Sequence, residues 1–417
     1  MSRKTMARGV PRHLTVLALV ALLAVLYNAA PSGAAASRAT TGPAGQVSVK
    51  AVNGYTKGLP PSVAKLYPHA GDPLGPSAYE HWKAEKSPWT LCFNNSYLGN
   101  TWRAAALSEF NTLAAQYQKA GLVRKYLSTN SNLNLPEQIQ QMRDMITVDH
   151  CSGIITIPTG TSGMDGVIKE AYQAGIPVVT DLGATTTPDA ENFDENWYAS
   201  GAAEMQDLAR AMHGKGNLLY VVGIPGETID IEYKAGVDSV LTRYPKIHLI
   251  GYATGQVTDS IAEGAVLTFL STHTQKITGV FQEGGMGAGI VDAFKQEKRP
   301  LPALVFVGSG SMVSIFHTAL KTGEKPNFYG LTDPPGWTME QSFNLLARIL
   351  EGQHPKNMTV YYTPPAITPA NVNSWWKPSF TSSTTAWPEP PTNPMRASVM
   401  DRYFFNGKAP LPYQGHR

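Results

Sequence analysis

Polar and aromatic side chains follow short apolar runs in the first half of the chain. They are Asn95, Tyr97, Asn100 and Trp102 after residues 89–93, and Asp181 after residues 177–180. In an open parallel sheet, ligands bind beyond the carboxyl ends of the strands. If both runs are strands of such a sheet, we expect these side chains to lie at one binding edge.

The second half repeats this arrangement, with polar groups at the ends of further apolar runs. These groups are residues 223–227, 254–256 and 282–284, together with Ser309 and Asp333. Sugar hydroxyls both donate and accept hydrogen bonds, so amides and carboxylates can pair with them repeatedly. An aromatic ring such as that of Trp102 can pack on the apolar C–H face of a sugar. The mixture predicts a small polar ligand, a sugar, although the same residue types also cap helices and form turns.

An enzyme is a rival interpretation of these polar groups. The sequence contains no Gly-x-Ser-x-Gly elbow and no Walker-type phosphate loop. Residues 284–289 are rich in glycine, but their spacing is not Gly-x-Gly-x-x-Gly, which favours a tight turn over a nucleotide site. Asp181 and Asp333 could form a glycosidase pair, yet no acid–base constellation accompanies them. We predict no catalytic residue and no cofactor.

The elements that position these groups alternate between short apolar runs and segments with helical spacing. The predicted strands are 89–93, 122–127, 153–157, 177–180, 217–222, 247–252, 277–281, 303–307 and 327–331. Such alternation predicts βαβ units and parallel sheets. The polar stretch 184–196 divides the pattern, so we expect two doubly wound α/β lobes.

The N-terminus has the three parts of a secretory signal. A basic stretch ends at Arg12, an apolar run of 13 residues extends from Leu14 to Leu26, and small residues follow at 34–36. A spanning helix needs about 20 apolar residues. Residues 1–36 therefore predict a signal peptide and an exported protein, periplasmic or at the cell surface, although an uncleaved anchor stays open.

The charge of the remaining chain argues against nucleic acid as a partner. Removing the four basic residues of the signal from the 34 Lys and Arg leaves 30, against 31 Asp and Glu. Nucleic-acid binding selects for a clustered basic surface.

The two cysteines, Cys92 and Cys151, lie in or beside predicted neighbouring strands. Outside the cytosol they can form a disulfide or remain as two half-buried thiols, and their spacing predicts no metal site.

Several runs, in order, resemble the ribose-type (type I) periplasmic sugar-binding proteins, the solute receptors of ABC importers. The run 91–102 is similar to their first strand and loop, 153–158 to their third strand, and 175–181 to their fourth strand with its ligand aspartate. The runs 278–283 and 303–308 are similar to strands of their second lobe. The resemblance covers about residues 89–353.

The resemblance implies a ligand between two lobes that are joined by a three-stranded hinge. It implies crossings near residues 198–200, 331–333 and 358–362. The implied ligand contacts are Tyr97, Asn100, Trp102 and Asp181 in one lobe, Tyr233 and Glu283 in the other, and Asp333 near the hinge. Tyr233 stands where the family often has Arg, and Gly310 where a ligand Asp is common. These departures leave the sugar unidentified.

The resulting domain prediction has four parts. Residues 1–36 are the signal, 37–86 a flexible linker, 87–199 plus 333–358 the first lobe, and 200–332 plus 359–417 the second lobe with a tail. We expect a monomer that traps a sugar and delivers it to the membrane permease of an ABC importer. A sensor that presents its closed form to a signalling partner is the alternative, and a carbohydrate-active enzyme is a further one. The tail residues Trp375, Trp376 and Trp387 either dock a partner or anchor the tail.

Overall fold

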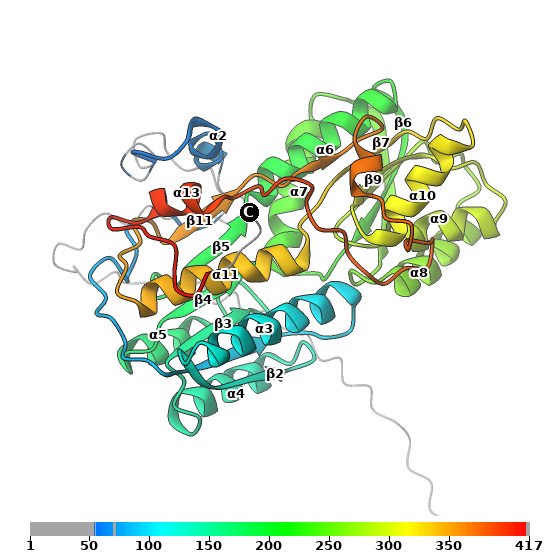
Figure 1. Cartoon of the computed structure of the whole chain (residues 1–417). Coiled ribbons are helices and arrows are strands. Elements are labelled where there is room, and N and C mark those ends of the chain that lie inside the picture. The colour runs from blue at the N-terminus through cyan, green and yellow to red at the C-terminus, as the bar shows by residue number, and fades with distance from the viewer. Residues whose placement is uncertain (1–53, 55, 70–71, 414–417) are drawn as a thin grey trace, which may run out of the picture. The chain divides into compact units, whose positions relative to one another are not determined.

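The computed structural model describes residue 54 and residues 56–69 and 72–413, which contain two six-stranded sheets (Figure 1). In order across the first sheet, the strands are β11 (Thr359–Tyr362), β5 (Glu191–Glu195), β4 (Val178–Asp181), β3 (Gly153–Ile157), β1 (Trp89–Asn95) and β2 (Val123–Asn130). In the second they are β12 (Ala366–Ile367), β10 (Phe328–Leu331), β9 (Ala303–Val307), β8 (Gly279–Gln282), β6 (Lys215–Val222) and β7 (Lys246–Thr254). Neighbouring strands are parallel, except that β12 runs antiparallel to β10.

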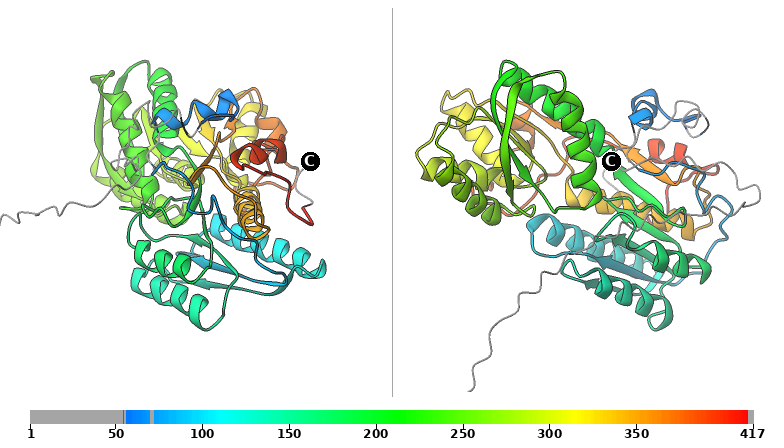
Figure 2. Two further views of the ribbon diagram at one scale, coloured as in Figure 1. Left: turned by 90° about the vertical axis from the view of Figure 1, so that its left-hand side faces the viewer. Right: turned by 180° about the vertical axis from the view of Figure 1, so that it is seen from behind.

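Helices cover both faces of each sheet, as the views from the side and from behind also show (Figure 2). On the first sheet these are α3 (Thr101–Lys119) and α11 (Pro335–Leu350) on one face, and α4 (Leu135–Thr147) and α5 (Asp165–Gln173) on the other. On the second they are α6 (Trp197–Ala211) and α7 (Thr228–Leu241) on one face, and α8 (Asp259–Thr272), α9 (Gly287–Gln296) and α10 (Gly310–Lys321) on the other. The predicted fold class, two doubly wound α/β lobes, is confirmed.

Up to strand β12, the chain crosses between the lobes at three places. The chain crosses between β5 and α6, between β10 and α11, and between β11 and β12. The first two crossings lie within a few residues of the predicted positions. The third lies at 363–365, later than predicted, because 359–362 first completes the sheet of the first lobe. The assignment of 359–362 to the second lobe is therefore corrected. The same holds for the tail residues Asp401 and Tyr403, which contact α11 and β11 of the first lobe.

Strand β5 lies in the polar stretch that the sequence suggested as a divider. All five of its residues are buried although three of them are acidic. The carboxylate of Asp194 accepts hydrogen bonds from the backbone N–H groups of Gly183, Ala184 and Glu195, at 2.8–3.1 Å. It also accepts one from Trp197 Nε1 at 2.7 Å. Burial of polar groups is tolerated when they are hydrogen-bonded, so an apolar pattern is not required here.

The predicted flexible linker is packed onto the first lobe over its described residues. Tyr67 and Tyr79 are both fully buried. The hydroxyl of Tyr67 donates to the Thr359 carbonyl at 2.8 Å, and that of Tyr79 donates to the Asp189 carbonyl at 2.6 Å. Tyr79 also accepts from the Val178 N–H at 2.9 Å. Two large aromatic side chains with satisfied hydroxyls stabilise this segment against β4 and β11.

The structure joins Cys92 and Cys151 in a disulfide, with Cα atoms 6.0 Å apart. Cys92 lies in β1, and Cys151 lies just before the neighbouring strand β3.

The predicted signal peptide lies outside the described residues. In the part of the chain that is described, no helix has the length and apolar character needed to cross a bilayer.

Candidate ligand-binding site

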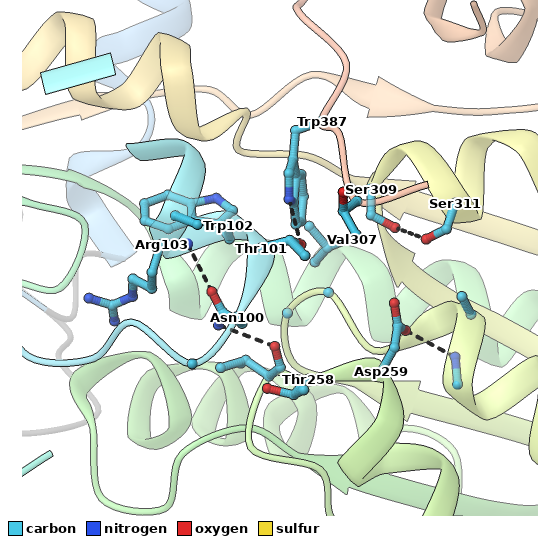
Figure 3. A pocket seen from close by; sticks show the side chains of 18 of the residues that line it. Asn100, Thr101, Trp102, Arg103, Thr258, Asp259, Val307, Ser309, Ser311 and Trp387 are labelled. Carbon is cyan, nitrogen blue, oxygen red and sulfur yellow. Dashed lines mark hydrogen bonds between the residues drawn. The ribbon is translucent and has the colours of Figure 1, made fainter. Parts of the chain in front are cut away.

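A pocket of about 570 Å³ lies between the two lobes (Figure 3). The N-terminal end of α3 and the hinge residue Asp333 line it from the first lobe. The starts of α7, α8, α9 and α10 line it from the second lobe. A volume of a few hundred Å³ is typical of sites for small molecules.

The start of α3 is held in place by two hydrogen bonds that reach beyond the helix. Asn100 caps the helix, because its side-chain oxygen accepts from the Arg103 N–H at 2.8 Å. Its Nδ2 donates to the Val257 carbonyl of the second lobe at 3.2 Å. Trp102 Nε1 donates to the Asp333 carbonyl at 2.7 Å. The same short segment therefore contacts the opposite lobe and the hinge.

Arg103 places a buried positive charge in the pocket. Its Nη1 donates to Asn95 Oδ1 and to Ser96 Oγ, both at 3.3 Å. Its Nη2 lies 4.0 Å from Glu227 Oε1 of the second lobe, which makes an ion pair across the cleft. Arg103 lines the pocket and is only 6% exposed. A guanidinium carries five donors in a planar fork, so it can serve these partners and a ligand hydroxyl together.

The second lobe adds carboxylates and hydroxyls to the pocket lining. Burial raises the pKa of Glu227 to about 7, while the nearby Arg103 guanidinium lowers it. Glu227 Oε1 is buried and has no hydrogen-bond partner among the described residues. Asp259, at the start of α8, accepts from the Gly289 N–H at 2.9 Å, and Ser309 caps α10. The contact that remains to Glu227 Oε1 is the ion pair with Arg103 at 4.0 Å.

The raised pKa of Glu227 predicts a stability that depends on pH. A folded-state pKa near 7 lies above the ordinary value of 4.5, so folding favours the protonated form. Its contribution is full below pH 4.5 and is lost as the pH rises through 7. The Glu227→Gln variant lacks this loss. Its free energy of unfolding relative to the wild type should therefore rise by about 2 kcal/mol between pH 5 and pH 8.

Urea unfolding of both proteins at the two pH values measures this difference. The exposed Glu170, paired with Arg143 at 2.9 Å, gives a matched Glu170→Gln control that should show no such gain. A difference in unfolding free energy between wild type and Glu227→Gln that stays constant with pH would contradict the assignment.

Four of the nine predicted ligand residues line the pocket: Asn100, Trp102, Ser309 and Asp333. The other five are not among its described lining residues. Asn95 and Tyr97 bond to each other, with Asn95 Nδ2 donating to the Tyr97 carbonyl at 2.5 Å. Asn95 instead helps to hold Arg103.

The side chains of Asp181, Tyr233 and Glu283 also lie outside the described pocket lining. Asp181 is fully buried and accepts from Ser342 Oγ of α11 at 3.0 Å. The Tyr233 hydroxyl donates to Glu204 at 3.0 Å. Glu283 accepts from the Tyr220 hydroxyl and from the Gly223 N–H. Each side chain turns into its own lobe, so Asp181 and Asp333 do not form a carboxylate pair in the pocket.

Sequence reasoning did not single out Arg103 and included Glu227 only as part of a polar loop. The sequence did hold a signal for both. Arg103 follows Trp102 in the first turn of α3, and Glu227 directly precedes α7. The glycine-rich residues 284–289 enter the pocket as backbone at the start of α9. Among the described residues, no group of three or more His, Cys, Asp or Glu side chains could hold a metal ion.

Comparison with known proteins gives one family match. A family model described as a periplasmic binding protein domain matches residues 91–354. The xylitol-binding protein of Mycolicibacterium smegmatis is 29% identical over 264 residues, which is 62% of this chain and 72% of that protein. The galactofuranose-binding protein YtfQ of Escherichia coli is 25% identical over 251 residues, or 57% and 76% of the two chains.

Solved structures share the fold. A solute-binding protein of an ABC transporter from Thermobispora bispora superposes with a TM-score of 0.64 at 23% identity, covering 73% of this chain and 92% of that one. The arabinose-transporter binding protein of a Shewanella species, bound to arabinofuranose, gives 0.60 at 20% identity, covering 68% and 93%. At these identities the likeness supports the two-lobed architecture.

Proposed function

The chain belongs to the periplasmic binding protein family, and we propose that it binds a sugar or polyol between its lobes for delivery to an ABC importer. We infer that it is exported and acts as a monomer outside the cytoplasm. The matched relatives are named for binding xylitol and galactofuranose, which supports this ligand class. Those relatives are binding proteins, and the proposal includes no catalytic step.

The observation that carries the proposal is a pocket whose polar groups come from both lobes. Arg103 of the first lobe faces Glu227 of the second across 4.0 Å. Two further bonds join the lobes: Asn100 Nδ2 donates to the Val257 carbonyl at 3.2 Å, and Thr228 Oγ1 to the Ala184 carbonyl at 3.1 Å. Contacts that exist only when the lobes meet favour the closed arrangement, and a bridging ligand adds to them.

The chemistry of the pocket suits a neutral polyhydroxy compound. Arg103 supplies donors, and the carboxyl groups of Glu227 and Asp333 supply oxygen acceptors, so a neutral polyhydroxy ligand meets both. The rings of Trp102 and Trp197 supply apolar surface for C–H groups. Enclosure removes water and thereby strengthens each polar contact. We infer that the importer recognises the closed pair of lobes.

A thermal-shift screen of the purified mature chain tests the proposal. The panel contains xylitol, D-xylose, L-arabinose, D-galactose and myo-inositol, with amino acids and nucleosides for comparison. A ligand at one hundred times its Kd stabilises the native state by about 2.7 kcal/mol, which raises the melting temperature. We expect a shift with a sugar or polyol alone. A shift only with amino acids or nucleosides would contradict a sugar or polyol as the ligand. Chemical conversion of the bound compound would contradict the proposal that there is no catalytic step.

A further inference from the structure

The C-terminal segment makes another connection between the lobes, outside the residues that the family model matches. We call residues 377–395 the strap. Before it, Val372 and Trp375 of α12 (Val372–Trp375) are buried in the core of the second lobe. At its far end, Asn393 Oδ1 accepts from Trp337 Nε1 of α11 at 2.9 Å. The segment runs from beside α8–α10 to α11, as the orange-red trace in Figure 1 shows.

The two ends of the strap are anchored firmly, one in each lobe. On the second lobe, Phe380 is buried and its carbonyl accepts from Ser314 Oγ at 3.1 Å. On the first lobe, Met395 is fully buried, and further along Asp401 pairs with the buried Arg348 at 2.7 Å. The residues between these anchors must therefore pass from one lobe to the other.

The middle of the strap lies against the second lobe so closely that a side chain would displace it. The Gly310 N–H donates to the Ala386 carbonyl at 3.1 Å. A Cβ added at Gly310 would lie 2.3 Å from that carbonyl oxygen and 3.1 Å from Thr384 Cγ2. The three nearest atoms that it would meet all belong to the strap. The strap can therefore pack at this distance only because residue 310 has no side chain.

Trp387 of the strap spans the gap between the two lobes. Its Nε1 donates to Thr101 Oγ1 at the start of α3, at 3.0 Å, and its side chain points toward Thr101 in Figure 3. The far edge of its ring lies against Gly285 of the second lobe, where an added Cβ would be 3.0 Å away. The pocket lining includes Trp387 together with strap residues 382–385.

We propose that the strap is a wall of the ligand site and that Trp387 contacts the bound sugar or polyol. The inference rests on the proposed function of the same pocket. The indole supplies an apolar face for C–H groups, and the strap hydroxyls at 382–385 can exchange hydrogen bonds with the ligand. Because the strap joins both lobes, the ligand enters or leaves when the contacts of Trp387 and Ala386 release.

Two variants remove the wall from different sides, and each has a matched control. Trp387→Ala deletes the indole, and Gly310→Ala expels the strap without touching the indole. Trp376→Ala removes a tail tryptophan that stacks on His317 4.1 Å away and does not line the described pocket. Gly264→Ala adds a methyl group in α8 where nothing lies within 4 Å. Melting temperatures first establish that all four variants fold.

Calorimetric titration with whichever of xylitol, D-xylose, L-arabinose, D-galactose and myo-inositol binds the wild type gives the first readout. We expect Trp387→Ala and Gly310→Ala to weaken binding by about tenfold or more, and both controls to stay within about twofold. Binding by Trp387→Ala that equals the wild type would overturn the ligand contact.

A second readout needs no ligand and separates this inference from the proposed function. Amide hydrogen exchange is followed in peptides that cover residues 98–104 and 284–289, the two sides that Trp387 touches. Both test variants should exchange faster there than the wild type, whereas the controls should match it. If no compound binds the wild type, the proposed function is wrong. Hydrogen exchange still tests whether the strap forms a wall of the pocket. Unchanged exchange in both test variants would overturn the wall.

Discussion

Replacing Arg103 with methionine should weaken sugar or polyol binding by about 30-fold or more, without unfolding the protein. The guanidinium is buried in the pocket and faces Glu227 across the cleft. Losing the charge-assisted hydrogen bonds of the guanidinium costs about 1.5–3 kcal/mol. Glu227, whose pKa burial raises and Arg103 lowers, then takes up a proton, so the ion pair across the cleft is lost too. The variant also loses the hydrogen bond that Arg103 donates to a ligand hydroxyl. Isothermal titration of the compound found in the screen measures the effect.

The exposed Arg143 provides the matched control for this change. It forms a surface ion pair with Glu170 at 2.9 Å, and such pairs contribute at most about 1 kcal/mol. Arg143→Met should therefore leave affinity unchanged. The pair itself is tested by adding Glu227→Gln to Arg103→Met, which should cost less than the sum of the single changes. Wild-type affinity in Arg103→Met would show that the ligand does not depend on this charge.

Replacing Asp194 with alanine should destabilise the fold by about 4 kcal/mol or more. Its carboxylate accepts from three backbone N–H groups and from Trp197 Nε1, all in the buried hinge region. The substitution leaves four buried donors without this acceptor, and each unsatisfied donor costs about 1–3 kcal/mol before the structure relaxes. The midpoint of urea unfolding, followed by circular dichroism, measures the loss.

Asp207 offers the contrast for Asp194, since it pairs with the exposed Arg210 on the surface of α6 at 2.6 Å. Asp207→Ala should change stability by less than about 1 kcal/mol. Asp194→Asn, which keeps the shape but replaces one acceptor oxygen by a donor, should fall between the wild type and Asp194→Ala. Equal midpoints for Asp194→Ala and Asp207→Ala would contradict the proposed role of the carboxylate.

The fold was predictable where burial and apolar character coincide. Strands such as β3 and β9 are continuous apolar runs, which is the pattern of strands covered on both faces. Strand β5 was missed because Asn192 and Asp194 are satisfied by hydrogen bonds instead of being excluded from the core. The packing of Tyr67 and Tyr79 was missed for another reason: their partners lie far away in sequence, and local composition carries no trace of them.

The site was predictable in position but not in the direction of its side chains. Of the residues chosen from strand ends, Asn100, Trp102, Ser309 and Asp333 line the pocket, because the topology brings these ends together. The same rule selected Asp181, which turns toward Ser342 of α11 instead. The contribution of Trp387 depends on where a long tail returns, which periodicity does not encode.

The order in which the lobes are completed follows from strand β11. Residues 359–362 form the outer strand of the first sheet, next to β5 at residues 191–195. Tyr403 then bonds to the Tyr361 carbonyl at 2.7 Å, which ties an even later residue to that strand. Pairings over such sequence separations close large loops and form slowly. A nascent chain that ends before residue 359 thus lacks β11, and its incomplete first lobe exposes surface on which chaperones and proteases can act.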